Sequence, residues 1–150
     1  MLHIVLYQPE IPPNTGNIIR LCANTGTALH LIHPLGFEMT KKSLRRASLD
    51  YKELAKVLSH NNLEEMKKHL PKKKYYAVST KGDTPLYKTR FNKGDTLLFG
   101  NETKGLPKKV LSSEDCLGVI RIPMAKDSRS INLSNAVAIV LFEALRQLNY

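Results

Sequence analysis

The sequence predicts an α/β fold: a mainly parallel sheet flanked by helices. Short runs rich in branched and aromatic residues alternate along the chain with segments of helical periodicity, and this alternation is typical of parallel sheets. The chain has 150 residues, a common size for one domain. No linker, repeat array or low-complexity stretch divides it. We therefore expect a single domain over residues 1–150.

Five strands are expected. Residues 2–7 are rich in Ile, Val, Leu and Tyr, which indicates a strand buried on both faces. The other four are read from the segments "ALHLIHP", "KYYAVST", "DTLLFG" and "LGVIRIP".

Three helical segments connect or follow these strands. The prolines of "QPEIPPN" end the first strand, and Asn14 is a favoured N-cap for a helix over residues 15–25 that stops at Gly26. The segment "NNLEEMKKHL" opens with a capping-box pattern, Asn62 followed by Glu65. The basic segment "TKKSLRRASLDY" is read as a short helix or a loop.

The last helix is the clearest element, with an apolar stripe from residue 132 to residue 148. Ala138, Ile139 and Phe142 widen this stripe beyond what one core face requires. A helix that is apolar on nearly all sides is usually buried on both, here by a second subunit.

The charge balance favours a polyanionic partner. The chain has 23 Lys and Arg against 13 Asp and Glu, a net charge of +10, and phosphate contacts attract nucleic acid through counterion release. The segment "MKKHLPKKKYY" carries much of the excess. The alternative is an ordinary solvated lysine-rich surface.

Several classes of site are excluded. Two cysteines give neither a disulfide framework nor a zinc spacing. His30 and His33 point to opposite faces of a strand, and the other histidines show no recognisable partners, so no metal is expected. There is no Walker, dinucleotide or nucleophile-elbow motif. No apolar run could span a bilayer and no signal peptide is present, so we expect a cytoplasmic protein without a membrane partner.

Three polar loops follow predicted strands directly. They are "PPNTGNIIR", "FGNETKGLP" and "IPMAKDSRSINLSNA". Loops beyond the carboxyl ends of parallel strands build ligand sites. Gly100 and Gly105 would let a ligand approach the backbone, and Glu102 could order the loop between them. Together the loops predict a small-molecule site made largely of backbone groups, beside a basic surface.

These segments resemble the three motifs of the SPOUT methyltransferases, S-adenosylmethionine-dependent RNA methyltransferases with a trefoil-knotted α/β fold. The matching stretches are "PEIPPNTGNIIRLCANTG", "LLFGNETKGLP" and "IRIPMAKDSRSINLSNAVAIVLFEALRQ". The match covers the whole chain. In its minimal size the chain resembles the members of the TrmL (YibK-like) branch. Enzymes of this branch methylate the ribose 2′-oxygen of the wobble nucleotide in tRNA(Leu), which is cytidine or a modified uridine (5-carboxymethylaminomethyluridine). Asn101 and Lys104 stand where members often have proline and arginine.

The resemblance implies a C-terminal knot, a homodimer through the first and last helices, and bound S-adenosylmethionine. It places this cofactor against Val78, Gly100, Ile122, Ser130 and Leu133. Residues of the structural loops would be Asn14, Gly16, Glu102, Gly105 and Asn135.

The resemblance also implies that Arg20 and Asn17 serve catalysis and that Arg45, Arg46 and Arg129 contact the anticodon stem-loop of tRNA. We interpret Arg20 as orienting a phosphate, because a guanidinium with a pKa above ~12 is a poor base. The Lys72–Lys74 run is a further candidate tRNA contact. The alternatives are methylation of rRNA or another tRNA position, a non-catalytic RNA-binding module, and a small-molecule enzyme for acidic substrates.

Overall fold

The computed structural model describes residues 1–40 and 57–149. Most of the basic segment "TKKSLRRASLDY", including Arg45 and Arg46, lies outside these ranges.

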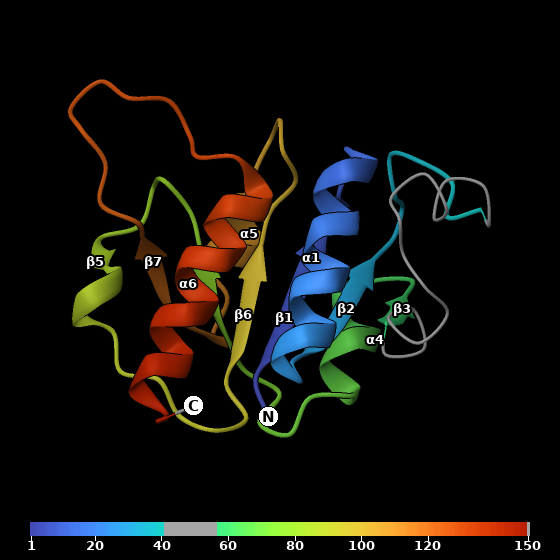
Figure 1. The fold of residues 1–150 in the computed structure, drawn as a ribbon, viewed down its shortest axis with the longest axis horizontal. Coiled ribbons are helices and arrows are strands. Elements are labelled where there is room, and N and C mark those ends of the chain that lie inside the picture. Colours follow the sequence, from blue (N-terminus) through green and yellow to red (C-terminus); the bar gives the residue numbers. More distant parts are fainter. Residues whose placement is uncertain (41–56, 150) are drawn as a thin grey trace.

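The described residues form one seven-stranded sheet in which every pair of neighbouring strands is parallel. Its order is β3-β2-β1-β6-β4-β7-β5 (Figure 1). The strands are β1 (His3–Tyr7), β2 (Ala28–Ile32), β3 (Val57–His60), β4 (Tyr75–Val78), β5 (Thr84–Pro85), β6 (Thr96–Phe99) and β7 (Cys116–Arg121). The α/β fold with a mainly parallel sheet is therefore confirmed.

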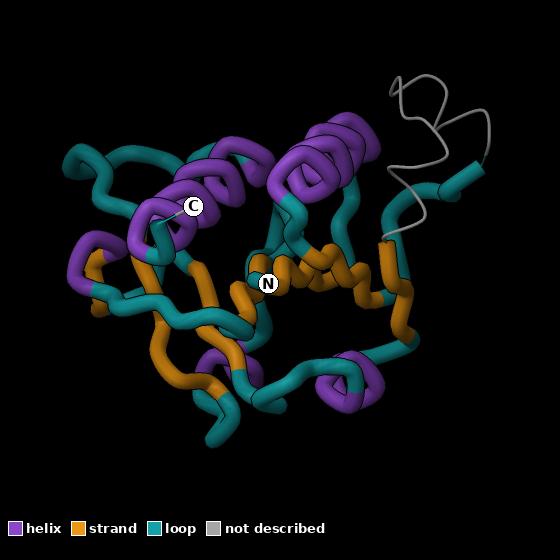
Figure 2. Tube along the Cα trace, turned by 60° about the horizontal axis from the view of Figure 1, so that its bottom comes forward, coloured by secondary structure: helices purple, strands orange, loops and turns teal. Residues whose placement is uncertain are grey.

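Helices cover both faces of the sheet, which gives three layers (Figure 2). On one face α1 (Pro12–Thr25) and α6 (Leu133–Gln147) pack side by side over β1 and β6. On the other face lie α4 (Leu63–Lys68) and α5 (Lys108–Leu111). A 3₁₀ turn, η1 (Leu86–Lys88), follows β5. Two apolar cores result, one for each face of the sheet.

The alternation of side chains along β1 explains the two cores. Ile4 and Leu6 pack beneath α1 and α6, whereas Val5 points to the face that carries α4 and α5. All three are fully buried, as expected for a central parallel strand covered on both faces.

All five expected strands are present, but β3 and β5 were not predicted. β3 is a four-residue edge strand with two exposed side chains, and β5 has only two residues. Neither leaves the continuous apolar run that reveals a central strand. The capping box at α4 is confirmed, since Asn62 Oδ1 accepts a hydrogen bond from the Glu65 amide at 2.8 Å.

The start predicted for α1 is wrong. The helix begins at Pro12, and its N-cap position is Ile11, which supplies no side-chain hydrogen bond. Pro12 and Pro13 occupy the first two helical positions, where the missing N–H groups would have lacked a partner anyway. Asn14 therefore lies inside the first turn, and its side chain is available for another role. The stop at Gly26 is confirmed, with a φ of 63°.

A chain of hydrogen-bonded histidines lies beneath α4. His30 Nε2 is 3.0 Å from His3 Nδ1, and His30 Nδ1 is 2.9 Å from His60 Nε2. The His69 ring contacts His60 with a centroid separation of 4.8 Å. The expectation that the other histidines lack partners is thus wrong, because strands far apart in sequence align these rings.

Burial favours the neutral form of His3, His30 and His60. His30 is fully buried and its pKa is lowered to about 3, first by desolvation and then by the charges of the neighbouring histidines. The pKa values of His3 and His60 are lowered as well, also chiefly by desolvation. Glu65 opposes this shift at His60.

We expect acid to destabilise the protein through His30. The unfolded chain binds the proton more readily than the folded one, so stability is complete above the unfolded pKa of 6.5 and falls as the pH drops below it. The loss from His30 should be about 2 kcal/mol between pH ~7 and pH ~5. Urea unfolding at both pH values measures it. In His30→Gln the dependence should shrink; an unchanged dependence would contradict the assignment.

Candidate active site

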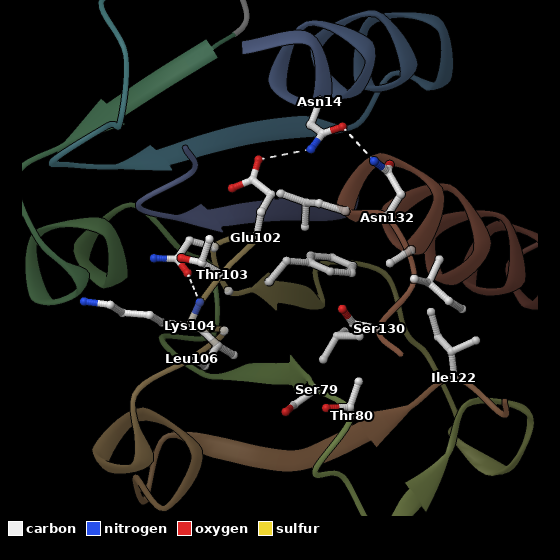
Figure 3. Close-up of a pocket in the computed structure, with 18 of the residues that line it drawn as sticks. Asn14, Ser79, Thr80, Glu102, Thr103, Lys104, Leu106, Ile122, Ser130 and Asn132 are labelled. Carbon is white, nitrogen blue, oxygen red and sulfur yellow. Dashed lines mark hydrogen bonds between the residues drawn. The ribbon is translucent and has the colours of Figure 1, made fainter. Parts of the chain in front are cut away.

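A cavity of about 510 Å³ opens where β4, β6 and β7 end (Figure 3). Val78 and Phe99 are the last residues of β4 and β6, and Ile122 directly follows β7. The loop from 100 to 106 and the loop from 122 to 132 enclose it. Its position is the carboxyl edge of the sheet, where ligands of parallel α/β folds bind.

The lining combines apolar walls with a few polar groups, as in small-molecule sites generally. Hydroxyl groups of Ser79, Thr80 and Ser130 lie in the opening. The other lining residues are Ile11, Asn14, Val78, Lys81, Phe99, Gly100, Asn101, Glu102, Thr103, Lys104, Gly105, Leu106, Ile122, Met124, Ile131, Asn132, Leu133 and Ala136.

The 100–106 loop folds tightly back on itself. A Cβ atom on Gly100 would come within 2.2 Å of the Gly105 carbonyl carbon and 2.4 Å of the Leu106 nitrogen. Gly105 has a φ of 66°, in the left-handed region that favours glycine. The Asn101 side chain accepts a hydrogen bond from the Lys104 amide at 2.7 Å. The loop therefore exposes its backbone to the cavity in one fixed conformation.

Glu102 projects from this loop to the start of α1. Its carboxylate accepts hydrogen bonds from the amides of Glu10 and Ile11, at 2.8 and 3.1 Å. It also accepts one from Asn14 Nδ2 at 3.2 Å. Since α1 has no acidic residue in its first turn, Glu102 supplies the negative charge that a helix N-terminus favours.

Asn14 extends this contact to α6. Its Oδ1 accepts a hydrogen bond from Asn132 Nδ2 at 3.0 Å (Figure 3). Asn132 Oδ1 in turn accepts from the amides of Ser134 and Asn135, at 2.9 and 3.3 Å, and so caps α6. One chain of hydrogen bonds therefore runs from the 100–106 loop through α1 to the start of α6.

A second contact ties the same loops together. Thr103 Oγ1 donates to the Glu10 carboxylate, with distances of 2.8 and 3.0 Å to its two oxygens. Glu10 also lies against Gly36, whose amide donates to the Pro9 carbonyl at 2.9 Å. The segment after β2 is thereby held at the same edge of the sheet.

The structure brings together all five residues expected to hold a cofactor, since Val78, Gly100, Ile122, Ser130 and Leu133 line this one cavity. The structural-loop residues Asn14, Glu102 and Gly105 line it as well. Gly16 is buried within α1, and Asn135 contributes its backbone amide to the cap of α6.

Arg20 and Asn17 are exposed on α1 and are not among the residues that line the cavity. Arg20 is six residues beyond Asn14, which corresponds to about 9 Å along a helix axis. Arg129 is exposed next to Ser130 in the 122–132 loop. The pocket of a single chain therefore lacks the arginine that the sequence singled out.

Sequence reasoning missed the polar residues after β4. Ser79, Thr80 and Lys81 line the cavity, although no glycine-rich pattern marks them. Ser79 and Thr80 were expected to belong to the strand "KYYAVST", but β4 ends at Val78, and the residues that follow it line the cavity. Met124 and Ile131 also line the cavity; they belong to the predicted loop "IPMAKDSRSINLSNA", although their residue types do not mark them as ligand contacts.

The comparisons with known proteins agree with this geometry. Residues 1–142 match the SpoU rRNA Methylase family. The chain belongs to this methyltransferase family. A relative from Escherichia coli K12 called tRNA (cytidine(34)-2′-O)-methyltransferase is 52% identical over 150 residues, which are all of this chain and 96% of the relative. One of the same name from Saccharophagus degradans is 51% identical, covering 97% of that protein.

Two solved structures with a similar fold are described by their chemistry or their ligand. One, described as giving insights into the 2-OH methylation of C/U34 on tRNA, has a TM-score of 0.89 at 44% identity and covers 99% of this chain and 97% of its own. The other is AviRb from Streptomyces viridochromogenes in complex with AdoMet, with a TM-score of 0.83 at 25% identity. The match covers 99% of this chain and 58% of AviRb.

Within residues 1–40 and 57–149, no group of three or more His, Cys, Asp and Glu side chains is arranged to hold a metal ion. In the same part of this SpoU-family chain, no helix is long and apolar enough to cross a membrane.

We expect Glu102→Gln to destabilise the protein by about 1–3 kcal/mol, because an amide placed among three N–H donors leaves hydrogen bonds unmade. Urea unfolding measures the change. The matched control is Glu114→Gln, since Glu114 is exposed and such a surface change typically stays within about 0.5 kcal/mol. Equal stability of the two variants would contradict a role for Glu102 in joining the loops.

Proposed function

We propose that the protein is an S-adenosylmethionine-dependent methyltransferase acting on the ribose 2′-oxygen of the wobble nucleotide of tRNA. The observation that carries this proposal is the pocket itself: the three motif loops enclose one cavity in a chain about half identical to tRNA (cytidine(34)-2′-O)-methyltransferases. The substrate is a tRNA(Leu) with cytidine or 5-carboxymethylaminomethyluridine at the wobble position. The reaction takes place in the cytoplasm.

The residues present fit the cofactor. A volume of about 510 Å³ falls within the range for ligands of this size. Apolar side chains such as Ile122 and Leu133 suit the adenine ring, while the backbone of the 100–106 loop and the Ser130 hydroxyl can pair with its polar atoms. The lack of a side chain at Gly100 lets the backbone of Gly105 and Leu106 pack against it, and this keeps the tight loop that borders the cavity. Bound there, S-adenosylmethionine supplies a methyl group on a positively charged sulfur.

What remains for the protein is to place the 2′-oxygen in line with that methyl group, within about 3–3.5 Å. Arg20 suits the phosphate that flanks the target ribose, because its planar guanidinium matches two phosphate oxygens. Its pKa makes it a poor proton acceptor at neutral pH. The hydroxyl proton therefore leaves to phosphate or water. Asn17, one turn earlier on the exposed side of α1, supports the same contact.

A homodimer would complete the site. α6 exposes Ile139 and Phe142, which are 42% and 52% accessible, and Ile11 before α1 is 44% accessible. Large apolar side chains of this kind on adjacent helices favour burial by a second copy. Because Arg20 lies on α1 outside its own pocket, a dimer packed through α1 and α6 would bring it to the pocket of the other chain.

The path of the chain supports the C-terminal knot that the family resemblance implies. The 122–132 loop leaves β7, near one edge of the sheet, and returns to place α6 beside α1 over its centre (Figure 1). In doing so it borders the same cavity as the 100–106 loop. We include the knot in the proposal as the way in which these loops are threaded.

The first test is methyl transfer from labelled S-adenosylmethionine to small RNA from cells that lack this gene. We expect label in 2′-O-methylcytidine or a 2′-O-methyluridine derivative, mapped to the anticodon wobble position of tRNA(Leu). Label at another tRNA position or in rRNA would keep the enzyme class and contradict the substrate. An absence of both label and cofactor binding would leave a non-catalytic RNA-binding module.

Mixed dimers test where Arg20 acts. Arg20→Ala and Gly100→Ala should each be inactive, the second because its Cβ has no room in the loop. When the two chains are mixed and allowed to exchange, a dimer in which Arg20 serves the other chain's pocket regains one complete site. We expect up to a quarter of wild-type activity when half of the dimers are mixed.

Failure to regain activity, with exchange verified by mass spectrometry of the mixed dimers, would place Arg20 in the service of its own pocket or outside the reaction. The matched control for Gly100→Ala is Gly118→Ala in β7. There a Cβ would meet only the Tyr76 ring at 3.9 Å, so activity should be unchanged.

A further inference from the structure

The loops at the amino ends of the strands carry exposed lysines that the pocket does not use. Lys73 and Lys74 precede β4, and Lys93 precedes β6. The two loops meet at the bottom of Figure 1, beside the N-terminus, and Figure 2 shows the same neighbourhood from below. Among residues 1–40 and 57–149, no carboxylate pairs with any of the three. We refer to Lys73, Lys74 and Lys93 as the lysine surface.

A buried aspartate holds the two loops together. Asp95 is 3% exposed, and one of its carboxylate oxygens accepts a hydrogen bond from Lys72 Nζ at 2.6 Å. The other accepts one from the Asn92 amide at 2.7 Å. The Asp95 carboxylate is therefore paired with the Lys72 ammonium group and with a backbone amide of its own loop. The three lysines beside it have no carboxylate partner in the part of the chain that the structure describes, and the fixed loops that carry them lower the entropy lost on binding.

The turn before β4 sets the direction of these side chains. Lys73 has a φ of 52°, a conformation that few residues other than glycine adopt. The turn reverses the chain so that Tyr75 is fully buried while Lys73 and Lys74 remain exposed. The Gly94 position packs against Pro71 and Lys72, at 3.6 and 3.7 Å from a Cβ built there. The exposure of these lysines therefore follows from the conformation of the turns that precede β4 and β6.

This surface is far from the pocket of its own chain. Ser79, which lines the cavity, is five positions beyond Lys74 along extended chain, and five such steps span about 17 Å. A stacked nucleic-acid strand rises about 3.4 Å per nucleotide, so roughly five nucleotides cover this distance. An RNA with one nucleotide in the pocket can reach the lysines only if it continues well beyond that nucleotide.

We propose that the lysine surface binds the sugar–phosphate backbone of the RNA substrate, about five or more nucleotides from the nucleotide that enters the pocket. The inference rests on the proposed function, since it takes RNA as the substrate. Lysine ammonium groups on a rigid platform neutralise phosphates without reading bases. The surface therefore orients a folded RNA on the enzyme, and the pocket selects the nucleotide.

The test compares two triple variants that lose the same charge. One is Lys73→Gln, Lys74→Gln and Lys93→Gln. The control is Lys88→Gln, Lys108→Gln and Lys109→Gln, whose lysines are exposed on η1 and α5. Binding of full-length tRNA and of a three-nucleotide RNA centred on the wobble position is measured by fluorescence anisotropy between about 50 and 200 mM salt. Steady-state methylation gives KM and kcat, and thermal unfolding checks the fold.

We expect the first variant to bind full-length tRNA roughly tenfold more weakly, with the slope of log K against log salt reduced by about 2 to 3. Its affinity for the three-nucleotide RNA and its kcat should be unchanged, because neither depends on distant phosphates. The control should keep the wild-type slope. Equal losses in both variants, or a loss in neither, would overturn the proposal.

The design separates this inference from the proposed function. If wild-type protein binds tRNA through the lysine surface but transfers no methyl group, the surface stands and the methyltransferase proposal fails. If wild-type protein methylates tRNA and the first variant does so with unchanged KM and salt slope, the function stands and the surface is overturned.

Discussion

The pocket depends on one electrostatic contact, the Glu102 carboxylate at the amino end of α1. Three N–H groups from the segment 10–14 converge on it. Pro12 and Pro13 remove two further donors from the same helix end. A helix start that its own sequence leaves uncapped is thus completed by a residue about ninety positions away. The start of α1 and the conformation of the 100–106 loop therefore depend on each other.

The hydrogen bonds continue into the 122–132 loop because both the Nδ2 and the Oδ1 atom of Asn14 have partners. It donates to Glu102 and accepts from Asn132, which in turn caps α6. Every member of this chain has a defined donor and acceptor, so the loops adopt one relative arrangement rather than several. Such fixed positioning is what transfer of a methyl group to a hydroxyl requires of a protein. The hydrogen bonds that cap the two helices therefore also place the walls of the pocket.

Buried polar groups organise the opposite parts of the sheet in the same way. Asp95 joins the turns before β4 and β6, and His30 links β1 to β3 through hydrogen bonds with His3 and His60. Asp95 and His30 are nearly inaccessible to water and each makes more than one hydrogen bond, as burial of polar atoms demands. Asp95 fixes the turns at the amino edge of the sheet, and the histidines join β1, β2 and β3, where His60 is the last residue of β3.

The sequence by itself determined the α/β class, the five strands β1, β2, β4, β6 and β7, both ends of the last helix and the loops that make the pocket. These features are local: an apolar run, a helical stripe or a glycine-bearing turn records them in neighbouring residues. Only the tertiary structure decided that Asn14 is a link and not a cap, that Ser79 and Thr80 share the pocket, and that the histidines touch. It also separated Arg20 from its own pocket and placed Lys72–Lys74 at the far edge of the sheet. These outcomes depend on partners dozens of residues away, and local pattern carries no information about which distant group will satisfy a buried donor or charge.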